Sequence, residues 1–213
     1  MTSLIVYPSY PKRVLEIISW LFSEVINKYH RSRNEIKFEL IQIRKAQNDP
    51  HEFAPIYNKY YDDIFIYVSK RIGDYDAVAD VTSKIFTNCL SKIEKFKYMG
   101  VPFSAWLYKI AINEIRQFFR AQKRFPRTIC ITDSDFQDIS QEAIEPSKYD
   151  KAQEIVPKLL ATLSETELQC IELRFFEKKS FKEIGYLMGL TEVNAKVRTY
   201  RILKKLKEKS LLN

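Results

Sequence analysis

Apolar side chains recur at intervals of three and four residues through most of this 213-residue sequence. That interval is the repeat of an amphipathic α-helix. The pattern holds over 11–29, 32–46, 53–71, 77–96 and 104–124, and again over 153–162, 165–175, 181–188 and 191–209. Four glycines and eight prolines are few for a strand-and-turn protein. The sequence therefore predicts an all-α fold.

The helical pattern is interrupted once for a long stretch, between Thr128 and Asp150. Six acidic residues lie in this stretch against a single lysine, Lys148. This composition is typical of a flexible acidic linker. We therefore expect two small helical domains at 49–127 and 151–213, joined by the linker 128–150 and preceded by an N-terminal helical extension at 1–48.

Composition also limits the classes of function. The formal net charge of +8 favours a polyanionic partner such as nucleic acid. Neither a membrane span nor a signal peptide is evident in the sequence, so we expect a cytoplasmic protein.

No enzymatic or metal chemistry is expected. The cysteines Cys89, Cys130 and Cys170 lie far apart, and neither His30 nor His51 is close to them in the sequence, so no metal site or disulfide is predicted. There is no histidine beside a carboxylate cluster and no glycine-rich phosphate loop. We expect a non-enzymatic protein without a cofactor.

The segment 181–191 has the layout of a helix-turn-helix, with Gly189 in the turn and Thr191 placed to cap the following helix. Exposed side chains early in that helix would enter a DNA major groove, and basic residues further along would meet phosphates. The candidate DNA-binding residues are Thr191, Glu192, Asn194, Lys196, Arg198, Arg201 and Lys205. The alternative is a solvated basic helix packed through Val193, Val197, Ile202, Leu203 and Leu206.

A second motif lies in the middle of the chain, where one long helix is predicted to begin at Ser104 as its N-cap. Its inward side contains Leu107, Ile110, Ala111, Ile115 and Phe118. A polar, mostly cationic ribbon contains Lys109, Asn113, Arg116, Arg120 and Lys123. The loop before it contains Lys97, Tyr98, Met99 and Gly100, a combination able to stack on an unpaired base. The alternative is that the ribbon is a solvated face and that Phe103 and Trp106 are ordinary core.

Together, the segments 103–113 and 163–176, with the helix-turn-helix that follows, resemble the extracytoplasmic-function class of bacterial sigma factors. The resemblance covers about 51–210. It implies a domain that grips the clamp helices of the largest polymerase subunit and melts the minus-ten element. It also implies a domain that reads the minus-thirty-five element beside the flap of the second-largest subunit.

The same resemblance assigns roles to residues. The loop from Lys97 to Gly100 would hold a flipped base, and Asn113, Arg116 and Arg120 would contact the opening strands. Polymerase docking is expected at Asp80, Ser83, Lys84 and Phe86. This segment departs from the family, in which a glutamine and an acidic residue usually stand at the positions of Ser83 and Lys84.

The extension 1–48 is a second departure, because compact members of the class begin near His51. It is either an added helical layer or a docking surface for an anti-sigma factor or a DNA-bound recruiting factor. The sequence thus indicates an alternative sigma factor that binds core RNA polymerase and promoter DNA. The competing hypothesis is a free-standing helix-turn-helix regulator, which would have no need of the cationic ribbon.

Overall fold

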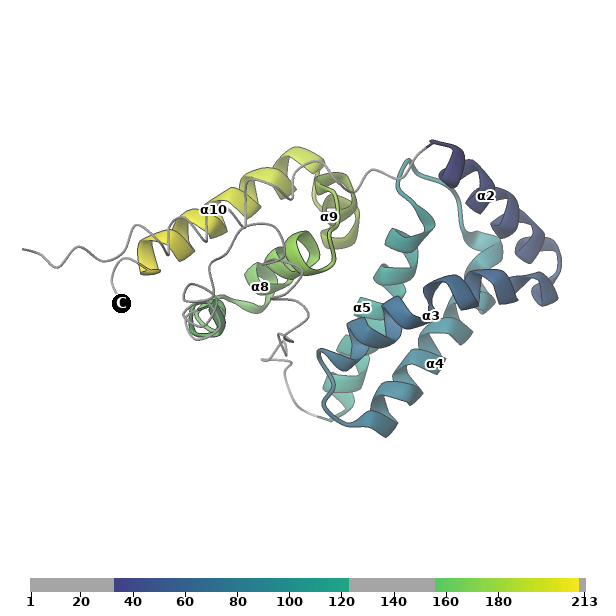
Figure 1. The fold of residues 1–213 in the computed structure, drawn as a ribbon, viewed down its shortest axis with the longest axis horizontal. Coiled ribbons are helices and arrows are strands. Elements are labelled where there is room, and N and C mark those ends of the chain that lie inside the picture. Colours follow the sequence, from purple (N-terminus) through teal and green to yellow (C-terminus); the bar gives the residue numbers. More distant parts are fainter. Residues whose placement is uncertain (1–32, 123–155, 211–213) are drawn as a thin grey trace, which may run out of the picture.

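The computed structural model describes residues 33–122 and 156–210, which we call the first and second bundles (Figure 1). The first bundle contains α2 (Arg33–Asn48), the 3₁₀ turn η1 (Pro50–Phe53), α3 (Ala54–Ser69), α4 (Tyr75–Lys92), the 3₁₀ turn η2 (Ile93–Lys95) and α5 (Phe103–Ala121). The second contains a helical turn at 156–160, α8 (Glu165–Ile171), the π-helix η3 (Glu172–Phe176), α9 (Phe181–Met188) and α10 (Glu192–Ser210). Within these two ranges there is no strand, and the predicted all-α fold is confirmed. The stretch 1–32 and the predicted linker at 128–150 lie outside the described residues.

Short polar side chains start several of these helices. Asp74 accepts a hydrogen bond from the Ala77 amide (3.0 Å) at the start of α4. Ser164 and Ser180 begin α8 and α9 with complete capping boxes, in which serine and the glutamate three residues later bond each other's backbone amides. These bonds satisfy amide groups that the first helical turn leaves without partners.

The predicted N-cap of α5 was wrong. The helix begins at Phe103, Pro102 holds the cap position without a side-chain bond, and Ser104 is buried in the first turn. Proline suits a helix start because its ring fixes φ near the helical value and it has no amide to satisfy. The chain reverses at Gly100, whose φ of 76° favours glycine.

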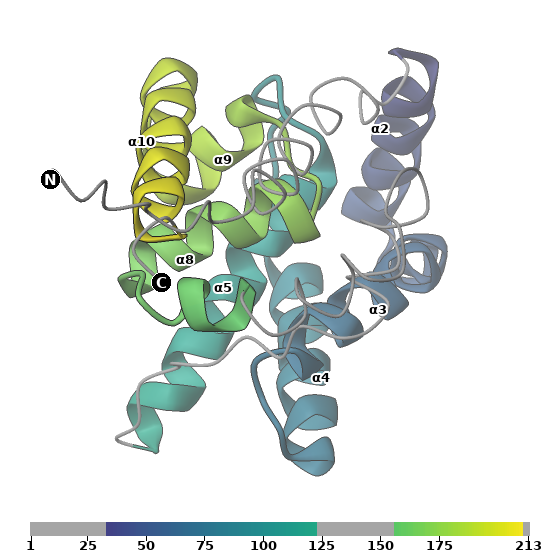
Figure 2. The ribbon, with the colours of Figure 1, turned by 60° about the vertical axis from the view of Figure 1, so that its left-hand side comes forward.

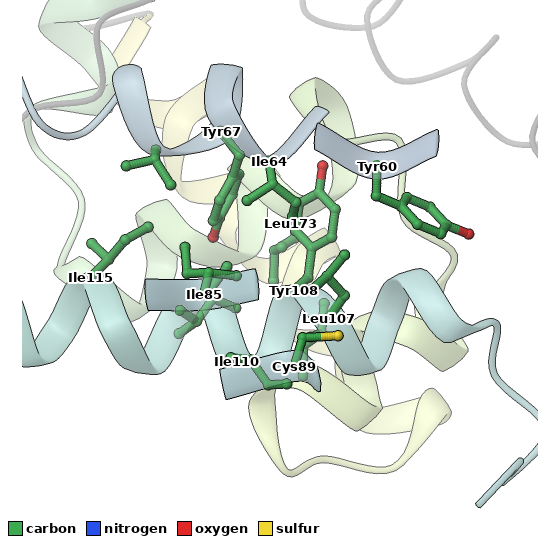
Figure 3. Close-up of a cluster of buried hydrophobic side chains, with 14 of the residues drawn as sticks. Tyr60, Ile64, Tyr67, Ile85, Cys89, Leu107, Tyr108, Ile110, Ile115 and Leu173 are labelled. Carbon is green, nitrogen blue, oxygen red and sulfur yellow. The ribbon is translucent and has the colours of Figure 1, made fainter. Parts of the chain in front are cut away.

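The core of the first bundle is formed by α3, α4 and α5 (Figure 3). Ile64, Ile85 and Leu107 are completely buried there, together with the thiol of Cys89. Burial raises the pKa of Cys89 to about 12, so this thiol stays neutral and acts as a small apolar side chain. Truncating such aliphatic side chains typically costs 2–5 kcal/mol.

Helix α2 adds a helical layer to the first bundle. Its Ile43 and Ala46 are buried, and the Gln47 side-chain amide donates to the carbonyls of Ile93 (2.9 Å) and Phe96 (3.1 Å). These two carbonyls lie just before the loop predicted to hold a base. Residues 33–48 of the predicted extension are therefore part of the first bundle's packing, and a separate partner for 1–48 stays a prediction.

The two bundles pack against each other rather than standing apart (Figures 1 and 2). Helix α9 lies against α5, and Leu173 of η3 is buried beside Tyr67 and Tyr108 of the first bundle (Figure 3). Arg71, just after α3, forms a buried ion pair with Glu172 of η3. None of the helices in the described ranges is long and apolar enough to cross a bilayer.

Candidate nucleic-acid interface

Helix α5 presents the predicted polar ribbon along one side. Lys109, Asn113 and Arg120 are exposed and Arg116 is half-buried, whereas Leu107, Ala111 and most of the other inward residues are buried. The separation follows from the 100° turn per residue, which places residues three and four apart on one face. Lys123, the last member of the ribbon, lies outside the described residues.

The second bundle holds two of the ribbon's cations. The Arg116 guanidinium donates to the Gln169 side-chain oxygen (3.0 Å), and Lys109 Nζ lies 4.6 Å from the ring centroid of Tyr186. Asn113 and Arg120 remain exposed. A DNA strand and the second bundle would therefore compete for the head groups of Lys109 and Arg116.

A buried tyrosine strengthens the same contact between bundles. Tyr108 donates to the Glu177 carboxylate (2.7 Å), and Lys179 Nζ lies 3.7 Å from the Tyr108 ring centroid. Burial, followed by the neighbouring Glu177 charge, raises the pKa of Tyr108 well above 10. The hydroxyl therefore stays protonated and remains a hydrogen-bond donor.

The loop before α5 exposes the side chains suited to an unpaired base. Met99 is 70% exposed and Tyr98 is 46% exposed, and Lys97 is also exposed. Trp106 instead packs on Phe96 and Phe103, with ring centroids 5.3 and 5.4 Å away. The tryptophan is thus half-buried packing, while the loop offers apolar surface and a positive charge together.

The helix-turn-helix forms as the sequence predicts. Gly189 ends α9 in the left-handed conformation (φ 70°, ψ 34°), and Thr191 Oγ1 accepts from the Asn194 amide (3.1 Å). Glu192, Asn194, Lys196 and Arg201 are exposed along α10.

Two of the candidate DNA-binding residues lie against α8. Arg198 donates to the Thr166 hydroxyl (3.1 Å), and Lys205 Nζ lies 2.9 Å from both oxygens of Glu167. The alternative of a helix packed through five apolar side chains holds for Ile202, Leu203 and Leu206 but not for Val193 and Val197, which are exposed. The buried side of α10 is formed by Ala195, Thr199, Ile202, Leu203 and Leu206.

Sequence reasoning missed the role of Gly185 in α9. A Cβ built on this residue would lie 2.8 Å from the Leu190 carbonyl oxygen and 3.2 Å from the carbonyl carbon of Thr191. The backbone of the turn thus passes directly over Gly185. A glycine inside a helix, four residues before the turn glycine, was the available signal, because interior glycine costs helix stability without such a reason.

The contact between Glu167 and Lys205 gives α8 a dependence on pH. The Ser164 amide and Lys205 lower the pKa of Glu167 from 4.5 to about 2. Because the folded pKa is depressed, the carboxylate stabilises the fold fully above pH 4.5, and this contribution is lost as pH falls toward 2. We expect Glu167→Gln to lower the free energy of unfolding by about 1 kcal/mol at pH 7 and by almost nothing near pH 2, as measured by urea unfolding across this range.

The matched control for this pH series is Glu165→Gln, which changes an exposed carboxylate in the first turn of α8 without removing the capping box. Its effect is expected to be a few tenths of a kcal/mol. A Glu167→Gln penalty that stayed constant from pH 7 to pH 2 would mean that the carboxylate's charge is unimportant.

Comparison with known proteins identifies both bundles. Residues 56–125 match the Sigma-70 region 2 family, and residues 159–208 match Sigma-70, region 4. This chain is a sigma factor of the extracytoplasmic-function class. The first match contains almost all of α3 and the whole of α4 and α5, and the second contains α8, α9 and almost all of α10. A free-standing regulator is not favoured, because it would not account for the match to region 2.

Curated relatives of the sigma factor agree with this family. The chain is 28% identical over 173 residues to the ECF RNA polymerase sigma factor BldN of Streptomyces coelicolor, a match that covers 79% of this chain and 63% of BldN. It is 21% identical over 153 residues to the ECF RNA polymerase sigma factor SigM of Bacillus subtilis, covering 71% of this chain and 91% of SigM.

A solved structure shares the fold of the sigma factor. CnrH, determined in complex with the cytosolic domain of CnrY, superposes with a TM-score of 0.54 at 19% identity. The match covers 80% of this chain and 95% of CnrH.

The sigma factor's predicted docking residues lie on α4. Asp80, Ser83 and Lys84 are exposed, whereas Phe86 is buried beneath Tyr57, with ring centroids 4.7 Å apart. Phe86 therefore supports this face from below, and Tyr57 presents the aromatic surface above it. Across 33–122 and 156–210, no three His, Cys, Asp or Glu side chains gather into a group that could hold a metal.

Proposed function

We propose that this sigma factor docks on the clamp helices of the largest polymerase subunit through the exposed face of α4. In this proposal α5 and its preceding loop hold the opened minus-ten strands, and α10 reads the minus-thirty-five element beside the flap. The observation that carries the proposal is the exposed loop of Lys97, Tyr98 and Met99, which places stacking groups beside a positive charge at the start of α5. Asn113 and Arg120 continue the exposed polar surface further along the helix. An unpaired base has lost its stacking partner, so it needs an apolar or aromatic surface on which to stack. The phosphates of the opened strand still repel one another, so they need positive charge nearby.

In this proposal the two bundles separate when the promoter binds. Lys109 and Arg116 are occupied by Tyr186 and Gln169 while the bundles are packed together. Engaging DNA with the whole ribbon requires releasing these contacts. Reading two promoter elements that lie apart on the duplex requires the same separation.

The experiment that tests the strand-opening role replaces Asn113 and Arg120 with alanine together. Core polymerase carrying this variant is expected to bind promoter DNA in the closed form almost normally, because both side chains are needed only once strands separate. Permanganate reactivity of minus-ten thymines should fall about tenfold, since a lost phosphate or base contact typically costs 1–3 kcal/mol.

The matched control combines Asn58→Ala with Arg44→Ala, an exposed amide on α3 and an exposed arginine on α2. It removes the same two functional groups and should leave permanganate reactivity unchanged. Normal opening by the Asn113/Arg120 variant, or an equal loss in the control, would remove the ribbon from the mechanism.

A further inference from the structure

The outward face of α10 carries an apolar stripe between cations. Val193 is 68% exposed, Val197 is 41% exposed, and Tyr200 follows at helical spacing. At 100° per residue, Lys196 lies on one side of the two valines and Asn194 and Arg201 lie on the other. The buried side of the helix, with Ala195 and Ile202, points the opposite way.

These valines do not serve the packing of the second bundle. Valine has below-average helix propensity, and exposing it gains no hydrophobic stabilisation. Tyr200 has a partner, since its ring centroid lies 6.3 Å from that of Phe181. Val193 and Val197 instead lie in the first two turns of the helix that follows the helix-turn-helix turn. In this motif, those turns contact base edges.

The charges around the stripe select the kind of partner. The cores of protein–protein interfaces are depleted of charge, whereas here Lys196, Arg201 and Lys204 are all exposed around the valines. Apolar surface bordered by cations suits a DNA major groove, where phosphates line both rims. The one apolar group on the groove floor is the thymine C5-methyl.

We propose that Val193 and Val197 are specificity-determining residues that read thymine methyl groups in the upstream promoter element; this inference rests on the proposed role of α10. A valine side chain has few rotamers in a helix, because it is branched at Cβ. Contact with a methyl group therefore costs it little conformational entropy. Four residues separate the valines, about 6 Å along the helix axis. This distance corresponds to about two base pairs, so the upstream element contains two thymines with roughly that separation.

The test uses the full chain assembled with core RNA polymerase. The holoenzyme selects duplexes from a library randomised in its upstream half, and the best duplex is remade with deoxyuridine at each thymine in turn. Deoxyuridine removes only the methyl group. We expect affinity to fall about fourfold at one or two thymines, the value of one buried methyl-sized group.

The valine variants and the deoxyuridine duplexes together form a double-mutant cycle, in which the protein and the DNA are changed separately and together. Val193→Ala and Val197→Ala should each weaken binding to the selected duplex about fourfold and should each lose the response to deoxyuridine at one thymine. The control, Ile66→Ala, removes an exposed apolar side chain on α3 and should keep the full response. Circular dichroism should show unchanged helix content in all three.

Four outcomes would overturn the inference. If the selected duplexes share an upstream sequence but deoxyuridine lowers affinity at none of its thymines, no methyl group is read. A variant that kept its full deoxyuridine response would mean that the valines are not the readers. Loss of core-polymerase binding instead of DNA binding would assign the stripe to the polymerase. No upstream enrichment by the unaltered chain would instead contradict the proposed function of α10, and the inference with it.

Discussion

Replacing Glu172 with alanine is expected to lower the free energy of unfolding by about 3 kcal/mol or more. The carboxylate pairs with Arg71 across the two bundles, and only 4% of its side chain and 8% of that of Arg71 are exposed. Removing one member of a buried ion pair leaves the other charge without compensation, which typically costs 3–5 kcal/mol. Arg71 also donates to the Tyr67 carbonyl and lies over the Tyr67 ring, so its position is fixed by the first bundle.

Calorimetry and X-ray scattering would measure this effect. The Glu172→Ala variant should unfold at lower temperature and have a larger radius of gyration, because the lost pair joins the bundles. The double variant Arg71→Met with Glu172→Leu should recover much of the loss, since it removes both charges while retaining apolar volume.

The control for the ion pair is Glu208→Ala, which removes an exposed pair with Lys204 on α10 (3.9 Å). Exposed pairs of this kind contribute at most about 0.5 kcal/mol. A Glu172→Ala variant no less stable than this control would show that the bundles are not held together by the pair.

Replacing Gly185 with alanine is expected to disable the helix-turn-helix. The added Cβ would lie 2.8 Å from the Leu190 oxygen, 3.2 Å from the Thr191 carbonyl carbon and 3.3 Å from the Glu192 amide nitrogen. All three are backbone atoms, so relief requires α10 to move away from α9. We expect a loss of about 1–3 kcal/mol in stability, which urea unfolding would measure. Binding to upstream DNA should weaken at least about tenfold, because a displaced helix no longer fits the groove.

Gly73→Ala is the matched control for this prediction, because a Cβ at Gly73 would meet nothing within 4 Å. This change should be neutral or slightly stabilising, since alanine restricts the unfolded chain. Normal upstream binding by Gly185→Ala would mean that the turn adapts and that its close approach to α9 has no role in positioning α10.

The sequence predicted the helices well because their signals are local. The turn at Gly189, the cap at Thr191 and the ribbon spacing on α5 depend on residues within one or two helical turns. The N-cap of α5 was misplaced by two residues, at Ser104 instead of Pro102, because a serine near a helix start normally caps it. Here Pro102 had already set the helical φ.

The contacts between the bundles could not be predicted from local pattern. Arg116 and Lys109 recur at the spacing of a solvated face, and nothing within α5 indicates that Gln169 and Tyr186 hold them. The two faces of α10 were equally ambiguous, because valines at 193 and 197 fit the helical repeat as well as Ala195 and Thr199 do. Which side packs depends on how closely α9 approaches, and Gly185 determines that distance.

We expect this sigma factor to direct core RNA polymerase to promoters through two separate DNA-binding bundles. The decisive measurement maps the 5′ ends of RNA made on sheared genomic DNA by purified core polymerase, with and without the full chain. Adding the chain should create new start sites that share one motif just upstream and a second, thymine-containing motif farther upstream. The same start sites with and without the chain would contradict this expectation.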